Sequence, residues 1–192
     1  MPMNLTKYFE IQSLEGPTTR TEYQRVMLVV HSLNSLGSKI AIDWPKWASA
    51  SNYFGSVLRI FGTDEELAQV RSALESYVAK VANAKGKKPL VLGLVKDVPA
   101  EAKLTWMFRR NRPTERARSK SKAKRLERRA LARGETPKTY TPVFLETHTL
   151  MILSLTTGQY FPLDIERVRP SHLDFDCSEP NAYGLGVPIP RF

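Results

Sequence analysis

Residues 56–81 read SVLRIFGTDEELAQVRSALESYVAKV and largely determine the predicted architecture. The first part, SVLRIFG, is a short apolar run typical of a β-strand. Thr63 and Glu66 follow at the spacing of a capping box, in which two side chains bond free amide groups at the start of a helix. Apolar residues then recur at helical spacing, at Leu67, Val70, Leu74, Tyr77 and Val81. The stretch therefore predicts a strand followed directly by a helix.

The flanking segments extend this pattern in both directions. Upstream lie a strand at 8–14, a helix at 19–37 that opens with a Thr19 and Glu22 capping box, and a strand at 39–44. Downstream, the apolar run PLVLGLV predicts a strand at 89–95. The resulting order is β-α-β-β-α-β, which is that of a ferredoxin-like unit.

The rest of the chain has a different composition. A short apolar strand at 104–108 leads into a predicted helix at about 114–133, between Pro113 and Gly134. Two apolar runs around a TTGQ turn predict a β-hairpin at about 143–165, and YGLGVPIPRF is expected to close the chain as an irregular segment. We therefore expect an α+β protein with a ferredoxin-like domain at 1–98 and a second part at 99–192.

The excess positive charge is confined to RRNRPTERARSKSKAKRLERRALARG, residues 109–134. This stretch has 12 Lys or Arg and 2 acidic residues, and the remaining 17 basic residues are matched by 17 acidic ones. Such a concentration predicts a polyanionic partner. Nucleic acid is favoured over a membrane surface, because the helix has only a thin uncharged stripe of Ala, Ser and Leu where a membrane-lying helix has a wide apolar face.

Other features narrow the class further. No apolar segment is long enough to span a membrane, and the start of the chain lacks the pattern of a secretion signal, so we expect a soluble cytoplasmic protein. The single cysteine excludes an internal disulfide. A metal site could be built only from His172, Asp174, Asp176 and Cys177, and these lie too close together to surround one ion easily. We therefore expect no metal and no small-molecule cofactor.

Several short motifs occur together along the chain. They are a histidine, His31, on the first helix, a strand that ends IDWP, a basic helix that ends RLERRALARGE, a hairpin SLTTGQYF and a C-terminal YGLG. In this combination the sequence resembles the CRISPR repeat-processing endoribonucleases of type I-F systems, the Csy-type members of the larger Cas endoribonuclease group. The resemblance covers most of the chain.

The resemblance implies a metal-independent ribonuclease that cuts precursor RNA at the 3′ base of a repeat hairpin and stays bound to the product within an effector complex. A backbone subunit of that complex would be a partner. The catalytic residues it implies are His31, Ser154 and Tyr183. Histidine suits the role of base because it exchanges protons near neutral pH. The residues expected to contact RNA are Arg110, Arg112, Arg118, Lys122, Arg125, Arg128, Arg129, Arg133, Thr156, Thr157 and Phe161.

Arg112 departs from the family pattern, which has Gln at this position. Arginine pairs best with guanine and glutamine with adenine, so the preferred base at the foot of the stem is open. Two other functions also remain open at this stage: a non-cleaving, hairpin-binding subunit of a CRISPR ribonucleoprotein, and a general basic RNA-binding protein. His148 alternates with apolar residues of its strand and is expected to be structural.

Overall fold

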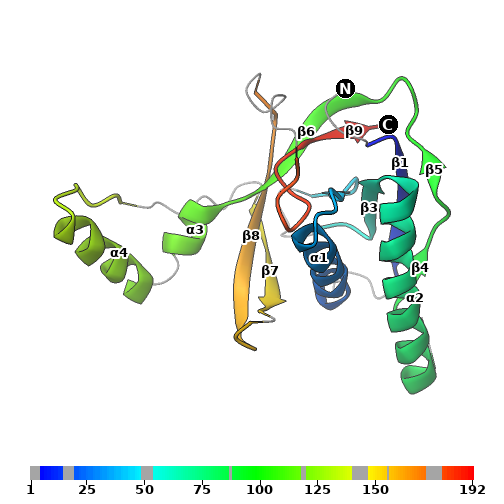
Figure 1. The fold of residues 1–192 in the computed structure, drawn as a ribbon, viewed down its shortest axis with the longest axis horizontal. Helices are drawn as coiled ribbons and strands as arrows, with labels where there is room; N and C mark the ends of the chain where they lie inside the picture. Colours follow the sequence, from blue (N-terminus) through cyan, green and yellow to red (C-terminus); the bar gives the residue numbers. More distant parts are fainter. Residues whose placement is uncertain are drawn as a thin grey trace.

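The computed structural model describes residues 5–14, 20–48, 54–86, 88–117, 120–139, 147–154, 156–171 and 179–192. The protein is an α+β fold with two antiparallel sheets, as the sequence predicts at the level of fold class (Figure 1). In the described part of the chain, no helix is both long and apolar enough to cross a membrane.

The first sheet is built from the first half of the chain. Its strands run in the order β2-β3-β1-β4, with β5 also paired to β1. Together with the two helices that interrupt them, the elements are β1 (Lys7–Ser13), α1 (Arg20–Ser35), β2 (Ala41–Asp43), β3 (Val57–Gly62), α2 (Asp64–Lys85), β4 (Leu90–Leu92) and β5 (Lys96–Asp97).

The step from β3 into α2 forms as predicted. The amide of Glu66 donates to Oγ1 of Thr63 at 3.3 Å, and the amide of Thr63 donates to the Glu66 carboxylate at 2.8 Å, so both halves of the capping box are present. Leu67, Val70 and Leu74 are buried, which fixes the inward face of α2. The other predicted box includes Thr19, which lies outside the described residues.

The second sheet comes from the second half of the chain, in the order β7-β8-β6-β9. Its strands are β6 (Lys103–Arg110), β7 (Thr147–Leu153), β8 (Tyr160–Val168) and β9 (Pro188–Arg191). The predicted hairpin corresponds to β7 and β8, although residues 143–146 are outside the described residues and β8 runs on to Val168. The predicted division between residues 98 and 99 falls between the strands of the two sheets and stays a prediction.

The expectation of an irregular C-terminal end was wrong, because residues 188–191 form β9. Ile189 pairs with Trp106, and Pro188 with Met107, on β6. Proline lacks an amide donor and is tolerated in a sheet at an edge, where one side of the strand needs no partner. β9 is such an edge strand, so its two prolines do not prevent pairing.

The basic helix also begins differently from the prediction. Two helical segments are described, α3 (Arg112–Ala117) and α4 (Lys120–Ala132), and residues 118–119 between them lie outside the described residues. The helix starts at Arg112 because the side chain of Asn111 accepts the amide of Thr114 at 3.0 Å, as an N-cap. Pro113 is accommodated in the first turn, where its missing amide has no helical partner. α4 lies beyond α3, away from both sheets (Figure 1).

A shared hydrophobic core joins the two sheets. Buried residues of the first sheet, such as Phe9 and Ile60, belong to the same cluster as Phe108, Leu150 and Ile165 of the second. α1 packs against β7 on one side and α2 on the other, and so lies between the hairpin and α2 (Figure 1). The core therefore holds α1, which carries His31, in a fixed position relative to the hairpin.

Candidate functional site

His31 and Tyr183 lie in direct contact although they are far apart in the sequence. Their rings are stacked, with centroids 4.4 Å apart and planes inclined by 11°. His31 is in the last turns of α1, and Tyr183 is in the loop before β9. Nδ1 of His31 is buried and has no hydrogen-bond partner among the described residues, which leaves Nε2 as the nitrogen that can exchange a proton with a ligand.

Hydrogen bonds within the loop before β9 hold Tyr183 in place. The side-chain oxygen of Asn181 accepts the amide of Tyr183 at 2.8 Å and that of Leu185 at 3.3 Å. Asn34, at the end of α1, donates to the carbonyl of Asn181 at 3.2 Å. The amide of Ile42 donates to the carbonyl of Gly184 at 3.0 Å. The loop is thus bonded both to the histidine helix and to β2.

Gly184 allows the loop to approach this closely. Its φ is 76°, in the left-handed region that favours glycine. A Cβ atom at this position would meet Cγ1 of Ile42 at 2.9 Å and the carbonyl oxygen of Ile40 at 3.0 Å. The YGLG motif therefore has a local reason for its first glycine, which is the packing of the loop on β2.

The Tyr183 hydroxyl is in an environment that keeps it protonated. Burial raises the pKa of Tyr183 above its usual value, and the nearby Glu115 carboxylate acts in the same direction. Arg110 opposes them, since its positive charge favours the phenolate. The net pKa shift is upward, so the phenol is a neutral hydrogen-bond donor at neutral pH.

Arg110 links this pair to the second sheet. Nε of Arg110 donates to Oε1 of Glu115 at 2.6 Å, and Nη2 donates to Oε2 at 2.8 Å. The guanidinium carbon lies 5.8 Å from the centroid of the Phe161 ring. The hydrogen bonds that Arg110 donates to Glu115 raise the pKa of Arg110 further, and the guanidinium stays charged. Of the residues predicted from the sequence, His31, Tyr183, Arg110 and Phe161 therefore form one connected neighbourhood.

Glu115 is a site residue that the sequence prediction missed. Its side chain is buried, and it also accepts the amide of Asp164 on β8 at 3.2 Å. Composition is the sequence feature that could have identified Glu115, because Glu115 and Glu127 are the only acidic residues within 109–134. An acid in so basic a stretch can pair with a neighbouring arginine, as Glu115 does with Arg110.

Ser154, Thr156 and Thr157 lie together in the turn between β7 and β8. Oγ of Ser154 accepts the amide of Thr157 at 3.3 Å, and its carbonyl accepts the amide of Gly158 at 2.8 Å. Both threonines are exposed. The turn thus presents hydroxyl groups on the hairpin that packs against the histidine helix.

The predicted RNA-binding cations of the basic helix are mostly exposed. Arg112 on α3 and Arg125, Arg128 and Arg129 on α4 are all open to solvent. Arg133 is exposed but paired with Glu135, through Nε and Nη2 at 2.8 Å each. Arg118 and the side chain of Lys122 lie outside the described residues. The described part of this region is therefore a projecting cationic surface.

His148, the other described histidine, does not enter the site. His148 is fully buried, its ring is stacked on Trp47 with centroids 3.8 Å apart, and Nε2 is 2.9 Å from the carbonyl oxygen of Ala48. The structural role predicted for it is confirmed. His172 and its acidic neighbours lie outside the described residues, and the described residues contain no group of three or more His, Cys, Asp or Glu able to hold a metal ion.

The fold and this neighbourhood define a class of protein. A histidine can take a proton, a neutral tyrosine and hydroxyl groups can donate hydrogen bonds, and a cationic helix can hold a polyanion. These are the parts of an α+β protein that binds and processes nucleic acid.

The sequence model of one family, described as CRISPR-associated protein (Cas_Csy4), matches residues 8–192. The chain belongs to this CRISPR-associated family. Membership implies association with CRISPR repeat RNA and supports a nuclease-type role in RNA processing. No match was found among curated proteins.

Proposed function

We propose that the protein is a metal-independent endoribonuclease that binds the CRISPR repeat stem-loop and cuts the precursor at the 3′ base of the stem. The observation that carries the proposal is the stacking of His31 on Tyr183, at 4.4 Å between ring centroids, beside the Arg110 guanidinium. This neighbourhood contains a base, a neutral donor and a positive charge, which are sufficient for cleavage through the ribose 2′-hydroxyl.

In the proposed step, His31 takes the proton of the 2′-hydroxyl. The 2′-oxygen then bonds to phosphorus, and the bond between phosphorus and the 5′-oxygen breaks. The departing 5′-oxygen takes a proton from water, so the products end in a 2′,3′-cyclic phosphate and a 5′-hydroxyl. Stacking on Tyr183 fixes the plane of the imidazole, and Ser154 is proposed to hold the ribose. Both contacts hold the reacting groups near the geometry of the transition state, so less rearrangement is needed for the reaction.

The rest of the site is proposed to hold the stem. The exposed arginines of α4 contact phosphate oxygens, and Phe161 stacks under the closing base pair. Arg110 and Arg112 meet base edges at the foot of the stem, where arginine favours guanine. Thr156 and Thr157 lie close to the cleaved phosphate. Arg118 and Lys122, from the same basic stretch of sequence, are also proposed to contact the RNA.

Retention and assembly are also part of the proposal. The protein stays bound to the mature guide RNA and contacts a backbone subunit of the type I-F effector complex in the cytoplasm. The strand order β2-β3-β1-β4 and the sequence of elements from β1 to β4 support a ferredoxin-like assignment for residues 1–98. Residues 99–192 then form the RNA-binding part.

The test is cleavage of a cognate repeat RNA in EDTA, with analysis of the 3′ end of the product. We expect a cyclic phosphate or 3′-phosphate. His31→Ala should lower the cleavage rate by about 10²- to 10⁴-fold, the range for loss of a general base, while hairpin affinity is retained. Ser32→Ala is a matched control, because Ser32 follows on the same helix but lines a groove that faces α2. Binding without cleavage by the unmodified protein would instead identify a structural subunit.

A further inference from the structure

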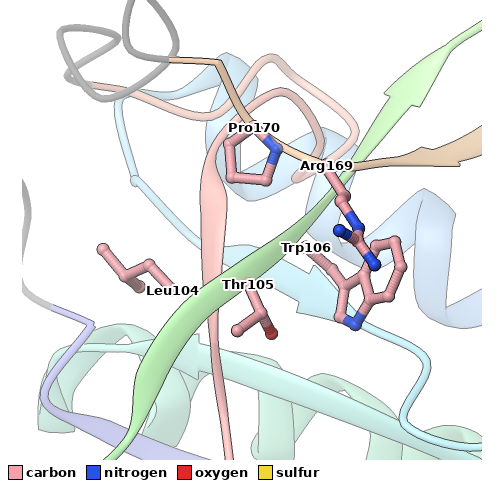
Figure 2. A pocket seen from close by; sticks show the side chains of 5 residues that line it. All are labelled: Leu104, Thr105, Trp106, Arg169 and Pro170. Carbon is pink, nitrogen blue, oxygen red and sulfur yellow. The ribbon is translucent and has the colours of Figure 1, made fainter.

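A second candidate site lies at the opposite end of β6 from Arg110. Trp106 is half-buried and lines a hollow of about 500 Å³ with Leu104, Thr105, Arg169 and Pro170 (Figure 2). Trp44 and Trp47 are buried in the core, with exposed fractions of 0% and 6%. Trp106 is therefore the tryptophan of this chain whose ring can meet a ligand.

Two arginines of the segment that ends β8 accompany the indole. The guanidinium carbon of Arg167 is 4.6 Å from the centroid of the Trp106 ring, and that of Arg169 is 5.4 Å away. Arg169 is exposed and lies beside the indole at the rim of the hollow (Figure 2). Guanidinium groups at these distances stack on an aromatic face and extend it, and the charge of the exposed Arg169 can meet an anion.

A described carboxylate that interacts with Arg167, that of Asp43, is buried rather than exposed to a ligand. Asp43 is fully buried, and its carboxylate oxygens lie 3.9 Å from Nη1 of Arg59 and 3.9 Å from Nη1 of Arg191. The positive charge of Arg167 also lowers the pKa of the Asp43 carboxyl, by less than Arg191 and Arg59 do. Among the described residues, this one buried carboxylate is thus shared among several arginines, whereas Arg169 is exposed beside Trp106.

The backbone also directs Trp106 to this surface. The pairing of β6 with β9 shifts its register between Leu104 and Trp106, as at a β-bulge. Bulges often re-aim a side chain next to a binding site. Trp106 precedes Arg110 by four residues on one strand, which is about 13 Å at the usual rise. That distance corresponds to about four stacked nucleotides at 3.4 Å each.

We propose that the surface formed by Trp106, Arg167 and Arg169 binds single-stranded RNA that continues from the foot of the repeat stem. The inference rests on the proposed function, because the proposed function places the foot of the stem at Arg110. An aromatic ring beside arginines binds single strands through base stacking and phosphate contacts, with little dependence on sequence. A duplex hides its base faces, so the ring selects the unpaired part of the precursor.

Three RNAs separate the possible sources of this strand: the bare hairpin, the hairpin with a 5′ flank, and the hairpin with a 3′ flank. Each carries a 2′-deoxy nucleotide at the cleavage position so that binding alone is measured. We expect one flank to increase affinity. Trp106→Ala and Arg169→Ala should each reduce that increase, by about 10-fold for the tryptophan, while affinity for the bare hairpin is unchanged. Lys80→Ala removes an exposed charge from α2 and serves as the control.

Tryptophan fluorescence gives a direct reading in the unmodified protein. The RNA with the bound flank should quench Trp106 and shield it from iodide, whereas the bare hairpin should not. The proposal is overturned if neither flank raises affinity, or if the gain survives Trp106→Ala. The proposal is also overturned if Trp106→Ala binds all three RNAs with unchanged affinity but fails to assemble into the effector complex. That result would show that this surface contacts another protein. If the unmodified protein does not bind the bare hairpin, the result contradicts the proposed function and not this inference.

Discussion

The carboxylate of Glu115 holds the guanidinium of Arg110 through two hydrogen bonds, at 2.6 and 2.8 Å. Because Glu115 is buried and also accepts the amide of Asp164, its position is fixed by β8 as well as by α3. The Arg110 guanidinium is therefore held in one orientation before RNA binds. A planar guanidinium held on one edge still offers its other donors to a base.

Glu115→Gln tests this arrangement. The variant keeps the shape but removes the charge and one acceptor, so we expect hairpins to be discriminated less well at the base pair next to the cut. A loss of about 1–3 kcal/mol in the free energy of unfolding should accompany it, since a buried hydrogen-bonded group loses its charged partner. Binding of hairpin variants and urea denaturation measure the two effects. Glu135→Gln, which breaks the exposed pair with Arg133, should leave stability nearly unchanged.

The Tyr183 ring and its hydroxyl can be separated by two substitutions. Tyr183→Phe keeps the stack on His31 and removes the donor, whereas Tyr183→Leu removes the aromatic face as well. If the ring orients His31, the leucine variant should lose more of the cleavage rate than the phenylalanine variant, with hairpin affinity unchanged in both. Single-turnover cleavage over a range of pH measures the effect. Equal rates in the two variants would argue against an orienting role for the ring.

Base preference at the foot of the stem should depend on Arg112. This side chain is exposed at the start of α3, so it is open to RNA. Arg112→Gln should shift the preferred base from guanine towards adenine, by about 1–3 kcal/mol for a bidentate contact. Competition binding among four hairpins that differ at one pair measures the shift. Lys124→Gln, on the exposed part of α4, should weaken all four hairpins alike.

Local sequence patterns predicted the elements whose signal lies within a few residues. The capping box of Thr63 and Glu66 is an example, because both partners sit in one turn of chain. β9 was missed because Pro188 and Pro190 argue against a strand until its place at the sheet edge is known. The stack of His31 on Tyr183 has no local signal at all. Only the family resemblance pointed to it, since contacts between distant segments depend on the whole core.

The close packing of Gly184 predicts a loss of both stability and activity on substitution. In Gly184→Ala the new methyl group meets Ile42 and the carbonyl of Ile40 at about 3 Å, and the φ of 76° is unfavourable for alanine. We expect a cost of about 2–4 kcal/mol, from overpacking of 1–3 kcal/mol added to a left-handed backbone penalty of about 1 kcal/mol. Displacement of Tyr183 should also slow cleavage.

Gly86→Ala isolates the backbone part of that cost. Gly86 has a similar φ of 69° at the end of α2, but a Cβ there would meet nothing within 4 Å. We expect this control to lose only about 1 kcal/mol and to cleave normally. If both variants unfold at the same denaturant concentration, the loop before β9 is not packed against β2 as the structure shows.

Asp43 makes stability depend on pH in an unusual direction. Burial raises the pKa of its carboxyl from the ordinary 3.8 to about 6, against the opposing pull of Arg191 and Arg59. Because the folded state binds this proton more tightly than the unfolded state, the contribution to stability is complete below pH 3.8 and is lost as the pH rises through about 6. The size is about 3 kcal/mol, at 1.36 kcal/mol per pKa unit. Asp43→Asn should therefore flatten the fall in urea-denaturation stability between pH 4 and pH 7, whereas Asp97→Asn, which removes an exposed carboxylate from the same sheet, should leave that fall in place. A fall that persists in Asp43→Asn would place its origin in another group, because the amide has no proton to lose in this range.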